Sequence, residues 1–305
     1  MSDKSFDPKF MGFLMSNLLA FAIIGLSALF LEHDHTDVIL VFSEFIIIPI
    51  LMGLVCAWYW LKTDLSGRSW TANVGANSLI AVFLSSVFLH EGVICLLIVS
   101  PLIFCFMLVG TAIGKAIFKR NNQNLNVSVF ALLALIFVAD SLSKHDYKNV
   151  VSDSIVINAT PDKIWKNVVS FEPIKQKNTY WLFRIGMPSP MATTVTGQYN
   201  GAGRKCIFSN GYVFGEKIVT YDENKDLTFD IIDQPRDPEI MGHIDIERGQ
   251  FLLKDNGNGT TTLIGNSWYK LYVFPVWYYD IWAQSITRNV HLRVMQHIKE
   301  LSEKN

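Results

Sequence analysis

The sequence predicts a chain of two parts: an N-terminal multi-span α-helical membrane region and a C-terminal α+β domain in which a curved sheet grips a long helix. Two observations predict this division. Long apolar runs dominate the first part, where lysine and arginine occur within 11–114 only at Lys62 and Arg68. The second part has frequent charges of both signs and short alternating segments with turn residues, a pattern typical of strands. We therefore place the membrane region at 1–148 and the α+β domain at 150–305.

Composition supports the same division and excludes one class of partner. The 305 residues have room for about two domains. Half of them are hydrophobic and only 17% are charged, which is unusual for a purely soluble protein. The net charge of −1 leaves no basic surface for nucleic acid. Cys206 is the only cysteine of the second part, so that part holds no internal disulfide.

Five apolar runs are candidates for crossing a membrane, because a spanning helix needs about 20 residues. They are residues 10–31, 38–61, 72–90, 93–114 and 126–142. The first run lacks a small-residue cleavage site and is followed by further runs, so we do not expect a cleaved signal peptide.

The loops between these runs predict an orientation. Lysine and arginine fall on every second loop, and the basic residues are Lys4, Lys9, Lys62, Arg68, Lys115, Lys119 and Arg120. Because basic loops stay in the cytoplasm, the N-terminus is expected there and residues 150–305 on the opposite side. Lys144 and Lys148 follow the fifth run and indicate the reverse, and the domain is cytoplasmic if that run does not cross.

Two features inside the apolar runs have both a functional and a structural interpretation. Glu44 lies within the second run, where a carboxyl group can mark a functional site. The alternative is a structural role: the carboxyl group lies near the membrane interface, pairs with Ser16 or Asn17, or is protonated. Gly110 and Gly114 form a GxxxG pattern, which lets helices approach closely within one chain or between two chains.

The two loops without lysine or arginine carry histidine and carboxylate side chains. The candidate metal ligands are His33, His35, His90 and Glu91. Imidazole and carboxylate groups suit zinc or another transition metal, and both loops are expected on one membrane surface. No compact ligand motif such as HExxH is present, and the alternative is a set of solvated loop residues.

The second part predicts strands, two short helices and one long helix. Thr160 and Pro161 are typical of a helix start, and Pro275 separates the strands from the last helix. That helix has an apolar stripe at intervals of three and four: Trp282, Ile286, Val290, Val294, Ile298 and Leu301. The expected helices are 161–169, 171–175 and 276–303. The expected strands are 152–158, 194–200, 204–210, 212–222, 226–233, 242–255 and 260–272, with DNGNG as a hairpin turn between the last two.

Several segments of the second part carry a family resemblance. The start ATPDKIW, the G-x-T-x-L pattern of the last hairpin strand and the long final helix resemble the START-like, Bet v 1-like superfamily, also called SRPBCC. Within it the chain looks like the polyketide cyclase/dehydrase group. The segments GRKCIFSNGYVFGEKI and PVWYYDIWAQSITRNVHLRVMQHIKEL resemble a membrane-attached bacterial form.

The resemblance implies a helix-grip fold with a deep apolar pocket for a lipid, a polyketide or another hydrophobic ligand, held at a bacterial inner membrane. The family has no shared catalytic motif, and neither a catalytic residue nor a cofactor is predicted. The candidate pocket residues are Trp165, Trp181, Arg204, Phe208, Phe214, Glu216, Phe251, Trp268, Tyr278, Trp282 and His291. Each aromatic side chain has core packing as its alternative role. His291 would serve as a general base only with a carboxylate beside it.

Three classes of function remain on the sequence alone. The favoured class is a membrane-anchored, non-catalytic module that binds a hydrophobic ligand or lipid for sensing or transfer, with membrane lipids or an apolar small molecule as its partner. The second is an enzyme of the polyketide cyclase or hydrolase type that uses the same pocket. The third is a transporter-like or structural membrane protein with a partner-docking domain. Oligomeric state is left open.

Overall fold

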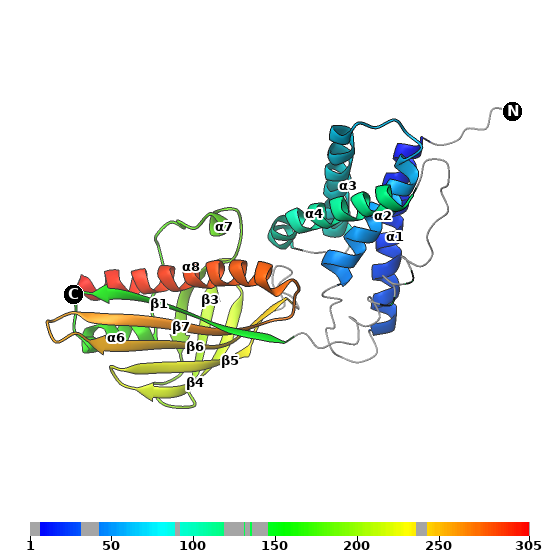
Figure 1. The fold of residues 1–305 in the computed structure, drawn as a ribbon. Coiled ribbons are helices and arrows are strands. Elements are labelled where there is room, and N and C mark those ends of the chain that lie inside the picture. Colours follow the sequence, from blue (N-terminus) through cyan, green and yellow to red (C-terminus); the bar gives the residue numbers. More distant parts are fainter. Residues whose placement is uncertain are drawn as a thin grey trace. The chain divides into compact units, whose positions relative to one another are not determined.

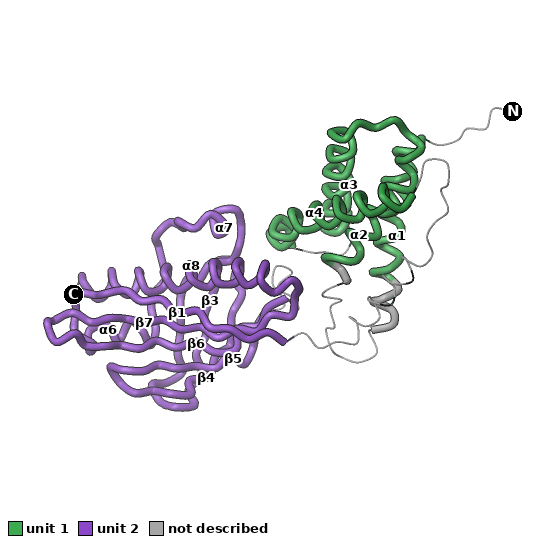
Figure 2. The backbone as a smooth tube through the Cα atoms, viewed as in Figure 1, with its two compact units in different colours: residues 1–145 green, residues 146–305 purple. Residues whose placement is uncertain are grey.

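The computed structural model describes residues 7–31, 43–88, 92–118, 131, 135, 146–235 and 243–304, with backbone alone for 26–31, 43 and 44. The chain separates into two compact units, Met1–His145 and Asp146–Asn305 (Figure 2). Each unit has its own buried cluster of apolar side chains, and each is described by itself.

The described part of the first unit is helical. Its elements are α1 (Pro8–Leu31), the π-helical turn η1 (Ser43–Ile47), α2 (Ile48–Trp60), α3 (Gly67–Phe88) and α4 (Val93–Ile117). Three stretches are long and apolar enough to cross a membrane, namely Pro8–Gly25, Gly67–Phe88 and Val93–Ile117. These three stretches correspond to the first, third and fourth runs expected from the sequence.

The second and fifth runs are described only in part. Phe45–Trp60 is an apolar helical stretch shorter than a usual span, and residues 38–42 of that run lie outside the described residues. Of the fifth run, 126–142, only residues 131 and 135 are described.

Glycines bring α2 and α4 into backbone contact. A β-carbon on Gly53 would lie 2.3 Å from the Met107 carbonyl oxygen, and one on Gly110 would lie 2.1 Å from the Ile50 carbonyl oxygen. Gly114 meets Ala57 in the same way. The GxxxG pattern therefore serves packing within this unit, because only a residue without a side chain fits at such a distance.

A polar network joins three of these apolar helices. The Asn17 side chain of α1 donates to Asn77 Oδ1 of α3 at 2.7 Å. Asn77 Nδ2 in turn donates to Ser16 Oγ at 2.9 Å and lies 3.2 Å from Cys56 Sγ of α2. Ser16 and Asn17, which the sequence offered as partners of Glu44, are thus bonded to Asn77. The side chain of Glu44 lies outside the described residues.

The second unit is a seven-stranded antiparallel sheet with a long C-terminal helix lying along it (Figure 1). The strand order is β1-β7-β6-β5-β4-β3-β2. The strands are β1 (Tyr147–Ile157), β2 (Pro190–Val195), β3 (Gly203–Phe208), β4 (Val213–Asp222), β5 (Asp226–Asp233), β6 (Ile244–Asp255) and β7 (Thr261–Leu271), and the helices are α6 (Pro161–Val169), α7 (Trp181–Arg184) and α8 (Val276–Glu303). This arrangement confirms the expected helix-grip architecture.

The C-terminal half of α8 and the helix α6 fill one end of the concave face. Val294, Met295 and Ile298 of α8 pack in one buried cluster with Ile164 and Val168 of α6. The same cluster holds the strand residues Ile218, Leu227, Phe229, Phe251, Leu253 and Leu263. Burying side chains of this size stabilises a fold by about 1.5–3 kcal/mol each, so this end forms the main core.

Two local expectations were wrong. Residues 171–175 do not form a helix, because their backbone bonds alongside β2: Ile174 N donates to Met191 O at 2.7 Å. The strand expected at 194–200 ends at Val195 and begins earlier, at Pro190. The helix start expected at Thr160 and Pro161 is confirmed, although Thr160 makes no side-chain capping hydrogen bond. Its hydroxyl bonds instead to Asp162, which lowers the pKa of that carboxyl.

Candidate functional site

The concave face has a packed half and an accessible half. Alternation along β3 and β4 places Arg204, Cys206 and Phe208 on one face together with Phe214 and Glu216. Arg204 and Glu216 are buried, whereas Cys206, Phe208 and Phe214 remain partly exposed. We call Cys206, Phe208 and Phe214 the open aromatic patch. It lies on the same face as the core but beyond the packed side chains.

The thiol of Cys206 lies among buried neighbours. Burial, and after it the charge of Glu216, raises the pKa of the Cys206 thiol to about 12. The residue as a whole is partly exposed. The raised pKa also keeps the thiol protonated at neutral pH, so it is not activated as a nucleophile.

Aromatic rings contact one another within the patch and, separately, beside α8. The Phe208 and Phe214 rings lie 4.9 Å apart. Trp282 of α8 is partly buried, with its ring 6.4 Å from that of Trp181, which is 44% exposed. Trp181 therefore reaches solvent beside α8.

Arg204 and Glu216 hold the boundary between the two halves. They form a buried ion pair, and Arg204 Nε also donates to the Val169 carbonyl oxygen at 3.3 Å. The guanidinium lies 4.4 Å from the centre of the Phe229 ring. Burial raises the pKa of Glu216, and the charge of Arg204 counteracts part of that shift. With these contacts the pair joins α6 to the strands and is part of the framework of the site.

A groove of about 830 Å³ opens between the ends of β5 and β6. The ladder between these strands ends at Asp230 and Arg248, which form a 2.6 Å ion pair. Beyond it the Gln234 side chain bridges the strands by accepting from Ile246 N at 2.9 Å. The lining residues are Asp230, Ile231, Ile232, Asp233, Gln234, Asp245, Ile246, Glu247, Arg248 and Trp268. Of the candidate pocket residues, this groove includes Trp268 alone, and its lining is mainly charged or amide-bearing.

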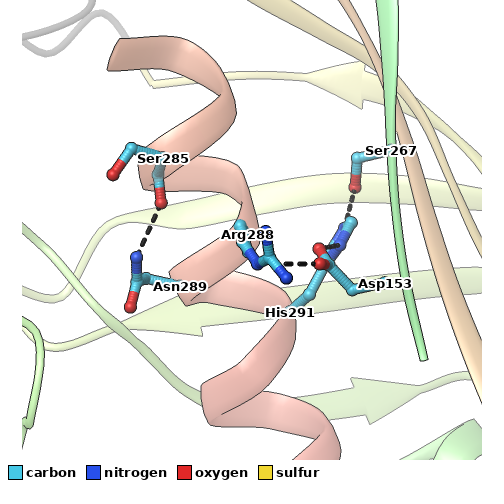
Figure 3. Close-up of polar contacts among 6 residues, drawn as sticks. All are labelled: Asp153, Ser267, Ser285, Arg288, Asn289 and His291. Carbon is cyan, nitrogen blue, oxygen red and sulfur yellow. Dashed lines mark hydrogen bonds and ion pairs between the residues drawn. The ribbon is translucent and has the colours of Figure 1, made fainter. Parts of the chain in front are cut away.

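A third arrangement connects α8 to β1 and β7 through His291 (Figure 3). His291 Nε2 lies 2.7 Å from Ser267 Oγ of β7, and Nδ1 lies 3.0 Å from Asp153 Oδ2 of β1. Arg288, one turn earlier on α8, places its Nε 3.2 Å from Asp153 Oδ1. His291 is 5% exposed and the Asp153 side chain 7%, whereas Ser267 is partly exposed. Burial lowers the pKa of His291, and Asp153 opposes that shift.

The other candidate pocket residues pack against their neighbours in the fold. Trp165 is buried in the core and donates from Nε1 to Tyr221 Oη at 3.1 Å. Phe251 is buried in the same cluster. Tyr278 is partly buried at the start of α8, with its ring 5.8 Å from that of Trp277. These side chains belong to packing and not to the open aromatic patch.

The sequence offered His291 but not its partners. Asp153 lies 138 residues before His291 and Ser267 lies 24 residues before it. Only the register of β1 against β7, which sets Asp153 opposite Gly265, places the carboxyl two residues from Ser267 on the same face. The sequence held one signal for this arrangement: the alternation of inward and outward side chains along β1 and β7, which puts Asp153 and Ser267 on the inward face.

The proposed metal ligands cannot be placed. His33, His35, His90 and Glu91 all lie outside the described residues. Within the described ranges, no group of three histidine, cysteine, aspartate or glutamate side chains is arranged to hold a metal ion.

Comparison with solved structures yields similarity over about half of the chain. No family model matches the chain, and no curated protein matches it. Truncated norcoclaurine synthase from Thalictrum flavum is 12% identical over 53% of this chain and 98% of that chain, with a TM-score of 0.38. A structural-genomics protein from Nitrosospira multiformis is 14% identical over 50% of this chain and 94% of its own, with a TM-score of 0.34. A structural-genomics protein from Mesorhizobium loti is 15% identical over 52% of this chain and 98% of its own, with a TM-score of 0.35. Values this low carry no conclusion about function.

Proposed function

We propose that residues 146–305 form a binding module for a small, largely apolar molecule, and that the N-terminal helices hold this module at a membrane. The observation that supports the proposal is the open aromatic patch. Its side chains face inward, as core residues do, yet keep accessible surface while the neighbouring half of the same face is closely packed. Concave, mostly apolar surfaces with a few polar groups are typical of ligand sites.

Membrane attachment is the second element of the proposal. Three stretches of the first unit are long and apolar enough to span, and the basic loops alternate along the sequence. We place the anchor in a bacterial inner membrane with the binding module on the extracytoplasmic side. A tethered module meets membrane-derived ligands at a raised effective concentration, which suits a role in lipid sensing or transfer. Membership of the polyketide cyclase/dehydrase group belongs to the same proposal.

Binding can be tested on the purified full chain in detergent. We expect organic extraction and mass spectrometry to recover a copurified apolar molecule. A fatty-acid-like fluorescent probe should titrate with one site per chain. Cys206→Trp fills the space beside Phe214 and should weaken probe binding about tenfold or more, because an extra ring leaves no room for the ligand.

A matched control lies one residue earlier on the same strand. Lys205 is exposed on the opposite face, so Lys205→Trp adds the same ring without filling the inner space. Circular dichroism should show that both variants are folded. If the wild type takes up no apolar probe and copurifies with no lipid, the proposal is wrong, and partner docking becomes the better account of this unit.

A further inference from the structure

We propose that Asp153, His291 and Ser267 form a hydrolytic relay in which Ser267 attacks the carbonyl carbon of an ester bound on the concave face. The proposal goes beyond binding and rests on the proposed function in one respect: the ester reaches Ser267 from the inner, accessible side of the sheet. The three residues come from β1, α8 and β7, and their contacts follow one another in a line (Figure 3).

The hydrogen bonds define the direction in which a proton can move. An ionised carboxylate only accepts hydrogen bonds, so the relay has His291 Nδ1 carry the hydrogen and donate it to Asp153 across the 3.0 Å contact. In a neutral ring Nε2 then has a free lone pair. Ser267 Oγ, 2.7 Å away, must donate its hydrogen to that lone pair. A serine that donates to an imidazole held by a carboxylate is an activated nucleophile.

The surroundings keep the ring neutral and oriented. Burial between helix and sheet disfavours the charged imidazolium, so His291 is available as a base at neutral pH. The charged groups facing it are Asp153 from β1 and, through that carboxylate, Arg288 from α8. Arg288 binds the Asp153 oxygen that His291 does not use, which fixes the carboxylate plane.

The base is the most enclosed member of the relay. His291 is 5% exposed, whereas Asp153 and Ser267 are each partly exposed as residues, with the Asp153 side chain itself 7% exposed. An enclosed base suits catalysis, because water must stay away from it while the substrate touches the serine.

The chemistry balances without any added redox agent. The Ser267 Oγ–carbon bond forms as the proton moves from Oγ to His291 Nε2 and the carbonyl electron pair moves to its oxygen. That pair returns as the carbon–oxygen bond to the alcohol breaks, and Nε2 gives the proton to the departing oxygen. Water then adds to the acyl-serine with Nε2 taking its proton, and Ser267 leaves with that proton restored. One ester and one water become one acid and one alcohol.

The test uses the full chain in detergent with a fluorophosphonate probe and p-nitrophenyl esters of short and long acyl chains. We expect peptide mapping to find the phosphonyl adduct on Ser267. Ester hydrolysis should fall at least about 100-fold in Ser267→Ala and in His291→Gln. Adduct formation should also slow on acidification, but only at a pH below the usual imidazole value of about 6.5, because burial lowers the pKa of His291.

Ser285→Ala is the matched control. Ser285 lies on α8 and bonds to Tyr180 Oη at 3.1 Å, away from the relay, so labelling and hydrolysis should stay at the wild-type level. Because His291→Gln can unfold the unit, Ser267→Ala carries the decision, and circular dichroism must show that it is folded. A folded wild type that binds apolar probes but forms no Ser267 adduct overturns the relay and leaves the binding module intact. A Ser267 adduct in a protein that binds no apolar probe overturns the binding module instead.

Discussion

Arg204 of β3 and Glu216 of β4 face each other across the sheet as a buried ion pair, with side chains 2% and 4% exposed. The pair separates the packed core from the open aromatic patch. As a pair, the two buried charges contribute little to the free energy of unfolding, because burying them costs about as much as their attraction returns. If one partner is removed, the remaining buried charge destabilises the fold strongly.

Removing one partner of this pair should therefore destabilise the unit strongly. For Glu216→Leu in residues 146–305 expressed alone, we expect a loss of about 3–5 kcal/mol in the free energy of unfolding, because the Arg204 charge stays buried. The double variant Arg204→Met, Glu216→Leu should recover most of that loss. Urea denaturation followed by circular dichroism measures both. Equal losses in the single and double variants would contradict this account of the pair.

Val294 tests the packing of α8 on the sheet. It is 6% exposed within the core cluster, so Val294→Asp should unfold residues 146–305 or destabilise them by several kcal/mol, since an unpaired carboxylate is poorly tolerated there. Leu292, two residues earlier and 38% exposed, supplies the control. Leu292→Asp should change the melting temperature little. A Val294→Asp protein that melts with the wild type would show that α8 does not pack as described.

His291 should make stability depend on pH in one direction. Its pKa lies below the usual value of about 6.5, so the unfolded chain takes up the proton first as the pH falls. The stability that the neutral ring contributes is thus present above about pH 6.5 and is lost on acidification. We expect the free energy of unfolding to fall less in His291→Gln than in the wild type between about pH 7.5 and about pH 5.5. Other groups titrate in both proteins, so identical slopes would remove His291 as the cause.

The alternation of basic loops predicts the side of the membrane on which residues 146–305 lie. A phosphatase active only outside the cytoplasm, fused after Asn305, should be active. The matched fusion of a reporter that fluoresces only in the cytoplasm should stay dark. Bright fluorescence would reverse the orientation and would mean that the run at 126–142 does not cross.

The sequence predicted the elements whose pattern is local. Val276–Glu303 matches the expected helix at both ends, because Pro275 marks the start and the apolar stripe repeats every three to four residues. Asp226–Asp233 matches an expected strand for the corresponding reason, a short run between turn residues. The helix expected at 171–175 is absent because the backbone of this segment hydrogen-bonds to β2 and not along its own chain.

The candidate site was predictable only in composition. Phe208 and Phe214 could be chosen as aromatic residues of strands, but whether such a side chain is packed or accessible depends on its neighbours in space. Trp165 and Phe251, chosen by the same rule, are core residues. His291 was among the candidate residues, yet its contacts depend on strand register, which no local pattern specifies.

The pairing of the first strand with the last has a consequence for synthesis. Among the described strands, β1 leaves the ribosome first, but its neighbour in the sheet, β7, is made last. At about 5–20 residues per second, β1 waits on the order of ten seconds for its partner. During that interval the nascent chain carries an unpaired, partly apolar strand directly behind the helices of the first unit. A chaperone or translocation factor that covers this strand would have to be present before translation ends, and a stop codon ahead of β7 would leave it uncovered for good.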